Sequence, residues 1–163
     1  MHENLKKTRK YIPHLVAGFC AMIFVDSLRY KFTNAPETQV IFGTLDAWSS
    51  SLGAPGLFAQ SGLFSQYVIG SAELVAASLL IVGILPALRR LQSIGFVLAL
   101  AIMSGAVSFH LFTPLGIDPN HDGGGLFVAA MVIWLSSLTM VVVRRKQLLS
   151  IGCGLLGVLK DKS

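Results

Sequence analysis

Charged residues are scarce in this chain. Only 13% of its 163 residues are Asp, Glu, Lys or Arg, whereas 53% are hydrophobic, and the mean hydropathy is +0.69. Soluble domains carry about 25% charged residues, so this composition is typical of a membrane protein. The net charge of +5 could suggest nucleic acid, but the basic residues lie beside apolar runs, where they indicate membrane topology and contact with lipid headgroups. We therefore expect a single membrane domain over residues 1–163, with membrane lipid and not nucleic acid as a partner.

Cysteine is also scarce. Cys20 and Cys153 are the only two, they are far apart in the sequence, and no CxxC motif occurs. A thiol relay or a zinc site built on cysteines is therefore disfavoured, and we predict no metal site.

Four apolar runs predict an all-α fold, an integral membrane four-helix bundle. The first run, residues 12–25, has only 14 residues, which is short of the ~20 needed to cross a bilayer. Its helix must therefore continue through Asp26 and Arg29. A cleaved signal peptide would look similar, but no A-x-A site precedes these charges. The predicted spans cover about residues 12–32, 64–85, 91–113 and 126–143.

The segment over residues 36–60 is expected to be extracytoplasmic and amphipathic. Pro36 suits a first helical turn, and apolar residues then recur at helical spacing on one side up to Leu52. Two interpretations are open: the helix lies in the membrane interface with Trp48 as its anchor, or it packs on the bundle as a lid.

Charge placement predicts the orientation. In a four-span arrangement, the basic clusters at residues 6–10, 89–90 and 144–146 fall on one side, whereas Glu37, Asp46, Asp118 and Asp122 fall on the other. The positive-inside rule then places both termini in the cytoplasm. We expect the membrane to be the inner membrane of a bacterial cell. Residues 144–163 form a cytoplasmic tail, either a weak interfacial helix or a frayed segment.

Two ionisable residues lie within the predicted second and third spans. Such groups are costly in a bilayer, so Glu73 and His110 mark either a functional site or a buried partnership. Their helical neighbours are small or polar, so both should face other helices. At 1.5 Å per residue, Asp26 and Glu73 lie at about the same depth, with Arg29 one turn further out.

These depths predict a polar intramembrane ligand site, open to the outer face. Two interpretations of its charges are open. Arg29 could simply neutralise Asp26 and Glu73, or the group could bind a ligand or a proton. For His110 alone, we favour a histidine that caps the third span beneath the following loop. The candidate residues are Asp26, Arg29, Tyr30, Lys31, Gln66, Glu73 and His110.

The loop at residues 118–123 has the sequence DPNHDG, which matches the first half of an EF-hand calcium loop. The acid required at the twelfth position is replaced by Ala129, so the calcium motif fails. We expect an ordinary turn built from Asp, Asn and Gly.

Three short motifs resemble the DoxX-like superfamily of small four-span membrane proteins. They are LRYKF at residues 28–32, GSAELVAASLL at residues 70–80 and AVSFH at residues 106–110. The resemblance covers roughly residues 15–143, and the segment between the first two spans resembles an extended branch of that superfamily.

The resemblance implies a small membrane subunit of a quinone-linked or stress-related redox system, with a redox protein or a second copy as partner and quinone as the possible cofactor. Some relatives are membrane subunits of a thiosulfate:quinone oxidoreductase, and an animal relative is a receptor assembly chaperone. A non-enzymatic assembly or binding role and transport of a small solute are the alternatives. Whether the chain is an enzyme, and which residues would be catalytic, stays open.

Overall fold

The structure is a computed structural model that describes the backbone of residues 2–160 and the side chains of residues 11–154. All regular secondary structure within residues 2–160 is helical, which confirms the predicted all-α class. In chain order the elements are α1 (His2–Phe32), α2 (Pro36–Ser51), α3 (Gln66–Val82), the 3-10 turn η1 (Pro86–Leu88), α4 (Arg89–Phe112), α5 (Gly125–Val143) and α6 (Arg145–Lys160).

Three stretches are long and apolar enough to cross a membrane, and they match three of the four predicted spans. They are Tyr11–Phe32, Pro86–Phe112 and Gly125–Val143. The remaining predicted span, residues 64–85, is shorter in the structure, because α3 has 17 residues. Ser65 begins α3 by accepting a hydrogen bond from the backbone amide of Val68, and Gly83 ends it.

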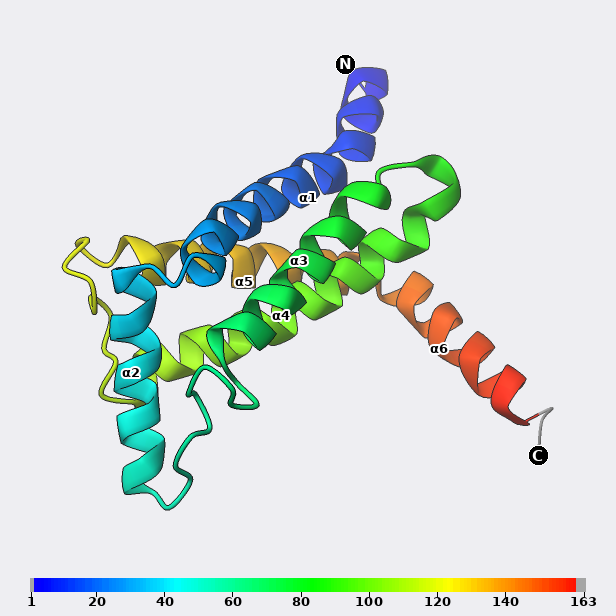
Figure 1. The fold of residues 1–163 in the computed structure, drawn as a ribbon. Helices are drawn as coiled ribbons and strands as arrows, with labels where there is room; N and C mark the ends of the chain where they lie inside the picture. The colour runs from blue at the N-terminus through cyan, green and yellow to red at the C-terminus, as the bar shows by residue number, and fades with distance from the viewer. Residues whose placement is uncertain (1, 161–163) are drawn as a thin grey trace.

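Four helices pack side by side in antiparallel order (Figure 1). α1 packs on α3, α3 on α4 and α4 on α5, and α5 also contacts α1. The predicted tail is mostly helical: α6 contacts the ends of α4 and α5 and then extends away from the bundle. Residues 161–163 of that predicted tail lie outside the described residues.

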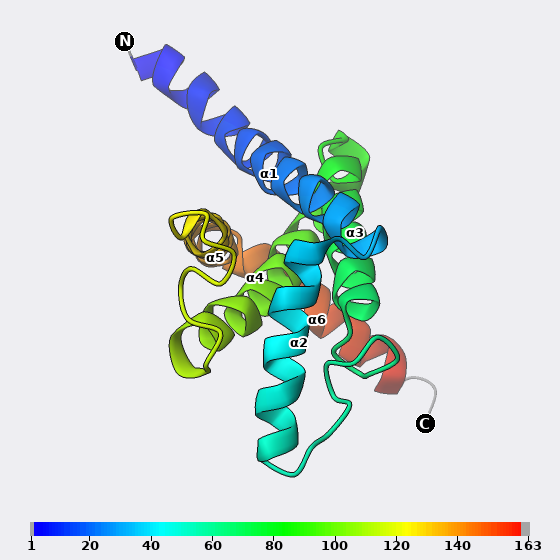
Figure 2. The ribbon, with the colours of Figure 1, turned by 60° about the vertical axis from the view of Figure 1, so that its left-hand side comes forward.

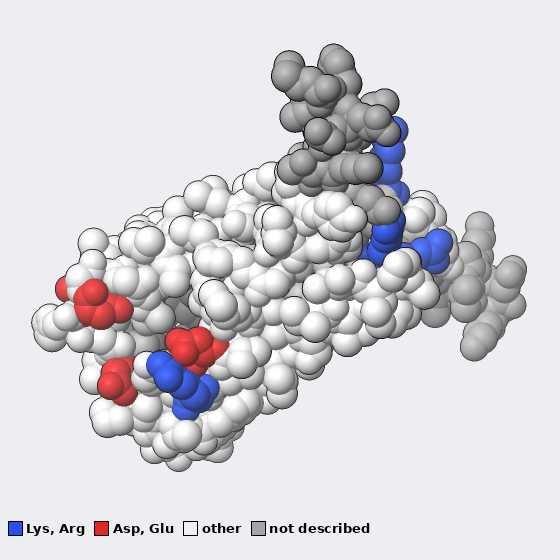
Figure 3. All heavy atoms as spheres, turned by 90° about the horizontal axis from the view of Figure 1, so that it is seen from above, with Lys and Arg blue, Asp and Glu red and all other residues white. Residues whose placement is uncertain are grey.

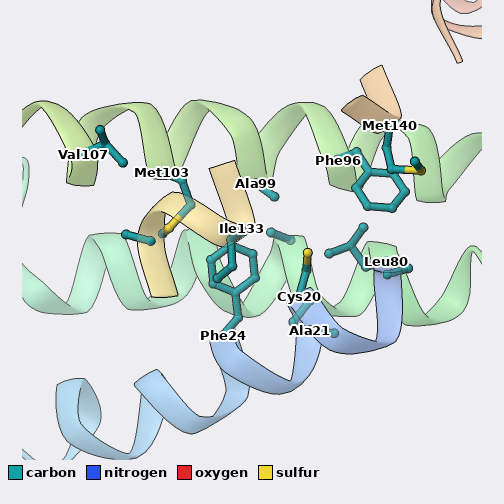
Figure 4. Close-up of a cluster of buried hydrophobic side chains, with 14 residues drawn as sticks. Cys20, Ala21, Phe24, Leu80, Phe96, Ala99, Met103, Val107, Ile133 and Met140 are labelled. Carbon is teal, nitrogen blue, oxygen red and sulfur yellow. The ribbon is translucent and has the colours of Figure 1, made fainter. Parts of the chain in front are cut away.

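The core of the bundle combines small residues with a few large ones (Figure 4). Cys20 and Ala21 on α1 lie near Leu80 on α3 and the Phe96 ring of α4 (Figure 4). Small side chains allow helix backbones to approach closely, which is how helices associate in a bilayer.

Two glycines set the spacing of α3 and α4. A Cβ added at Gly83 would lie 2.3 Å from the backbone nitrogen of Gln92, and one at Gly95 would lie 3.0 Å from that of Leu80. Only glycine allows such a close approach of the two backbones, so Gly83 fixes the turn and Gly95 the crossing point.

α2 crosses one end of the bundle (Figure 2). Leu45 is buried against Phe58 and Leu115, and the Trp48 ring meets the edge of Phe109 with 6.5 Å between ring centroids. This packing is what the lid interpretation expects. The helix ends at Ser51, close to Leu52 where the apolar spacing ends, and Gly53 adopts a positive φ of 87° just after it.

The bundle has two chemically different ends. We call the end that carries α2 and residues 113–124 the loop end, and the end at the α3–α4 turn and the start of α6 the basic end. On the face shown in Figure 3, acidic atoms gather at one end with one basic group among them, and the other basic atoms gather at the opposite end. The basic end carries Arg89, Arg90, Arg144, Arg145 and Lys146.

Candidate functional site

A buried ion pair joins α1 to α3 in the half of the bundle nearest the loop end. Nζ of Lys31 lies 3.0 Å from Oε2 of Glu73 and donates a hydrogen bond to Oε1 at 3.1 Å. Oγ of Ser27, one turn earlier on α1, donates to Oε2 at 3.2 Å and accepts a hydrogen bond from Lys31. The Glu73 side chain is only 4% exposed. The opposite charge and the two donors together offset the cost of holding a carboxylate away from water.

The helix face around Glu73 is small and polar, as the sequence predicted. Gln66, Gly70 and Ala77 are all buried with Glu73 on α3. A Cβ at Gly70 would meet the Phe32 ring at 3.4 Å and Lys31 at 3.5 Å, so a residue larger than alanine would separate the helices. Gly70 therefore lets Lys31 reach Glu73.

A second polar network lies beside this pair, where α1, α2 and α3 meet. Nε2 of the buried Gln66 donates to the backbone carbonyl of Lys31 and to Oδ1 of Asn34, both at 2.9 Å. Oε1 of Gln66 accepts a hydrogen bond from Nε2 of Gln39 on α2. Asn34 turns the chain from α1 into α2 with a positive φ of 56°, a conformation that asparagine tolerates. Gln66 thus fixes the position of α2 above the ion pair.

The interpretation that Arg29 bridges Asp26 and Glu73 is wrong. Arg29 pairs with Asp26 at 3.1 Å, but their side chains are 65% and 60% exposed on the outside of α1. Arg29 also donates to the hydroxyl of Tyr30 at 2.8 Å and lies over its ring. Each residue turns a helix by about 100°, so Ser27 and Lys31 face α3, whereas the other three side chains share a different face.

His110 is buried at the C-terminal end of α4, as predicted, and its ring lies beneath the following loop. Nδ1 hydrogen-bonds the carbonyl oxygen of Gly116 at 2.6 Å, and the ring meets Phe127 edge-on at 5.5 Å. Because a carbonyl only accepts, Nδ1 carries the proton in this contact. The ring therefore contacts the following loop, as predicted, but it bonds a loop carbonyl and not one of the last carbonyls of α4.

The predicted residues are not joined in a single bonded group. Among the described side chains, no hydrogen bond or ion pair joins Asp26 or Arg29 to Glu73 or His110. Lys31 bonds the buried Glu73, and Gln66 is buried beside them. Sequence reasoning missed three of their partners: the half-buried Ser27 and Gln39 and the exposed Asn34. The signal for Ser27 was its i, i+4 spacing from Lys31, which places both side chains on one face of a helix.

The loop before α5 forms turns, as predicted, and its Asp122 also caps the helix, which was not predicted. Oδ1 of Asp122 accepts hydrogen bonds from the amides of Gly124 and Gly125 at 3.0 and 3.1 Å, and Oδ2 accepts from Leu126 at 2.9 Å. Desolvation acts to raise the pKa of Asp122, but hydrogen bonds from the amides of Leu126, Gly124 and Gly125, with a side-chain interaction with Asp118, outweigh it and lower that pKa below its ordinary value. The carboxylate also complements the positive end of the helix dipole.

Sequence reasoning also missed a polar network at the basic end. Gln92 and Ser93 are fully buried on α4 and accept hydrogen bonds from Arg144, the residue that follows α5. Gln92 further contacts Nδ1 of His14 on α1 at 3.2 Å, and Ser93 donates to Gln147 on α6 at 2.8 Å. The available signal was a polar Gln-Ser pair just inside an apolar run.

Within the described residues, no group of three or more His, Cys, Asp or Glu side chains is placed to hold a metal ion. Comparison of the chain with models of protein families, with curated proteins and with solved structures finds no match.

Proposed function

We propose that this chain is a four-span protein of the bacterial cytoplasmic membrane that acts as a small subunit of a quinone-linked or stress-related redox system. The basic end lies in the cytoplasm with both termini, and the loop end lies outside. The positive-inside rule supports this orientation, because the basic end carries five Lys or Arg residues and Glu37, Asp46, Asp118 and Asp122 lie at the other end.

The fourth crossing is α3. Its 17 residues extend about 25 Å, which is short of the roughly 30 Å of a hydrocarbon core. The apolar residues beside it, Leu63 and Phe64 at one end and Ile84 and Leu85 at the other, extend the apolar length. α3 also packs along α1 and α4, both of which are long enough to cross.

The observation that carries the functional proposal is the buried Lys31–Glu73 pair with its Ser27 partner. A lysine ammonium and a serine hydroxyl are donors that suit the carbonyl oxygens of a quinone ring, and the Glu73 carboxylate can accept a proton beside them. The pair lies toward the proposed outer side, beneath α2 and Gln66. The resemblance to the DoxX-like superfamily supports the redox association by analogy only.

The test is photo-cross-linking of the purified protein in lipid nanodiscs with a short-chain azido-quinone. We expect labelled peptides from the C-terminal end of α1 and the N-terminal half of α3. Labelling of Lys31→Gln should be at least about tenfold weaker, because a charge-assisted hydrogen bond to the quinone is lost. Arg29→Gln is the matched control, because it removes an exposed cation two residues away. Equal labelling of Lys31→Gln and Arg29→Gln would contradict the proposal.

The second candidate is a non-enzymatic assembly or binding role. The observation that favours it is internal compensation: Glu73 is neutralised by Lys31, Asp26 by Arg29, and His110 is held by the Gly116 carbonyl. Ionisable groups that are compensated in this way can stabilise a scaffold without taking part in a reaction. Absence of quinone labelling together with co-purification of a stable membrane partner from native membranes would favour this role over the first.

A further inference from the structure

Arg144 holds a fixed position at the basic end. Its Nη2 donates to Oε1 of Gln92 and its Nη1 donates to Oγ of Ser93 at 3.3 Å. The guanidinium carbon lies 5.7 Å from the centre of the Phe96 ring, within the range of a cation–π contact. The side chain is half-buried, so it is oriented by three neighbours on α4.

The groups that hold Arg144 are themselves fixed. Gln92 and Ser93 are fully buried. Nε2 of Gln92 donates to the backbone carbonyl of Leu80 on α3 at 3.3 Å, and Oγ of Ser93 donates to Oε1 of Gln147 on α6 at 2.8 Å. Arg144 is therefore presented by a network that connects α3, α4 and α6, which is how a binding residue is held in one orientation.

The neighbours of Arg144 use only some of its N–H donors, and no carboxylate with a described side chain pairs with its positive charge. A guanidinium has five N–H donors, and the two bonds to Gln92 and Ser93 leave others available. Burial, followed by repulsion from Arg89, lowers the pKa of Arg144 from its ordinary value. Every carboxylate with a described side chain lies in the half of the bundle nearest the loop end, so none of them pairs with this cation. An anion bound here would relieve the repulsion and use the remaining donors.

Arg144 is flanked in the chain by exposed apolar residues as well as by the basic residues Arg145 and Lys146. Val142 and Val143, at the end of α5, are 55% and 66% exposed, and Leu149 on α6 is 67% exposed. A phosphate on a lipid would place its acyl chains along these side chains, whereas a free phosphate would leave them uncovered. The apolar flank therefore favours a lipid.

We propose that Arg144, oriented by Gln92 and Ser93, binds the phosphate of an anionic glycerophospholipid at the basic end, with Arg89 as a second positive charge. Basic positions between membrane helices at the cytoplasmic face are suited to such headgroups. This inference uses the membrane placement of the bundle and is independent of the quinone proposal.

The test is lipid titration of the detergent-purified protein, with bound lipid counted by native mass spectrometry. The probes are phosphatidylglycerol, phosphatidylcholine with the same acyl chains, and inorganic phosphate. We expect one tightly bound phosphatidylglycerol, weaker binding of phosphatidylcholine, and no protection against thermal unfolding by inorganic phosphate at the same concentration. Equal binding of the two lipids would overturn the site, and equal protection by phosphate would overturn its assignment to a lipid.

The matched variants are Arg144→Gln and Lys146→Gln, which each remove one positive charge from the same end. General attraction to an anionic lipid accounts for about a fivefold loss per basic residue, which is the loss expected for Lys146→Gln. Arg144→Gln should lose at least about tenfold, because directed hydrogen bonds are lost with the charge. Equal losses would contradict the proposal. Arg144→Lys keeps the charge and, should the glutamine variant not fold, gives the same test: we expect at least about a fivefold loss, and unchanged affinity contradicts a guanidinium site.

Discussion

Lys31 of α1 and Glu73 of α3 are 42 residues apart in the sequence, and their charged atoms lie 3.0 Å from each other in the interior of the bundle. Lys31, and not Arg29, therefore neutralises the Glu73 carboxylate on α3. The distinction has direct consequences for stability, because one pair is buried and the other is exposed.

Removing one member of the buried pair should destabilise the bundle. Lys31→Met leaves Glu73 without its counter-charge, and we expect a loss of about 3–5 kcal/mol in the free energy of unfolding in micelles. The double variant Lys31→Met with Glu73→Leu should recover much of that loss, giving a positive coupling in a double-mutant cycle. Arg29→Leu is the control and should cost less than about 1 kcal/mol, since its pair is exposed. Strictly additive losses would mean that the two residues are not in contact.

The α3–α4 turn should not tolerate a methyl group at Gly83. A Cβ there meets the backbone nitrogen of Gln92 at 2.3 Å, so Gly83→Ala should cost about 3 kcal/mol or more. Gly18→Ala, on α1, meets nothing within 4 Å and should be neutral or stabilise by about 0.5–1 kcal/mol. Thermal unfolding of both variants measures this difference, and an unaffected Gly83→Ala would show that the two helices are further apart.

Packing of α2 on the bundle predicts a difference between two apolar residues of that helix. Leu45 is buried against Phe58 and Leu115, so Leu45→Ala should cost about 2–4 kcal/mol. Val40 is 47% exposed on the same helix, and Val40→Ala should stay within about 0.5 kcal/mol. Hydrogen exchange of the α2 amides is the measurement. If both variants leave exchange unchanged, α2 rests in the interface and does not depend on the bundle.

The cap of α5 should give stability that depends on pH. The folded pKa of Asp122 is lowered, so the charged carboxylate contributes stability above the ordinary aspartate pKa, and that contribution is lost as the pH falls through the folded pKa. At neutral pH, Asp122→Ala should cost about 1 kcal/mol. Asp122→Asn keeps an acceptor but no charge, so its stability difference from the parent should shrink at low pH. A difference that stays constant with pH would contradict the charged cap.

Apolar length predicted most of the fold, because an unbroken run of apolar residues leaves few alternatives to a helix. The helix α3 ends at Val82, before the predicted end of its span at residue 85. The close approach of Gly83 to Gln92 at this turn is a tertiary contact, which hydropathy does not report. The burial of Glu73 and His110 followed from their small neighbours. The partner of Glu73 did not, because choosing Lys31 over Arg29 requires the rotation of α1 about its own axis. A rotation of a few tens of degrees decides which of the two side chains faces α3.

The network around Arg144 was missed for a related reason. Gln92 and Ser93 form a short polar pair in an apolar run. Their hydrogen-bond partner, Arg144, lies 51 or more positions later in the sequence. Only the packing of α4 against the end of α5 brings them together.

Four crossings with the basic end in the cytoplasm are the central claim of this account, and the short helix α3 is its critical element. Reporter fusions after Arg90, after Asp122 and after Lys146 test it most directly, using alkaline phosphatase for the outside and a fluorescent protein for the cytoplasm. We predict a cytoplasmic signal after Arg90, an extracytoplasmic signal after Asp122 and a cytoplasmic signal after Lys146. An extracytoplasmic signal after Arg90 would show that α3 does not cross in this direction and would contradict the account.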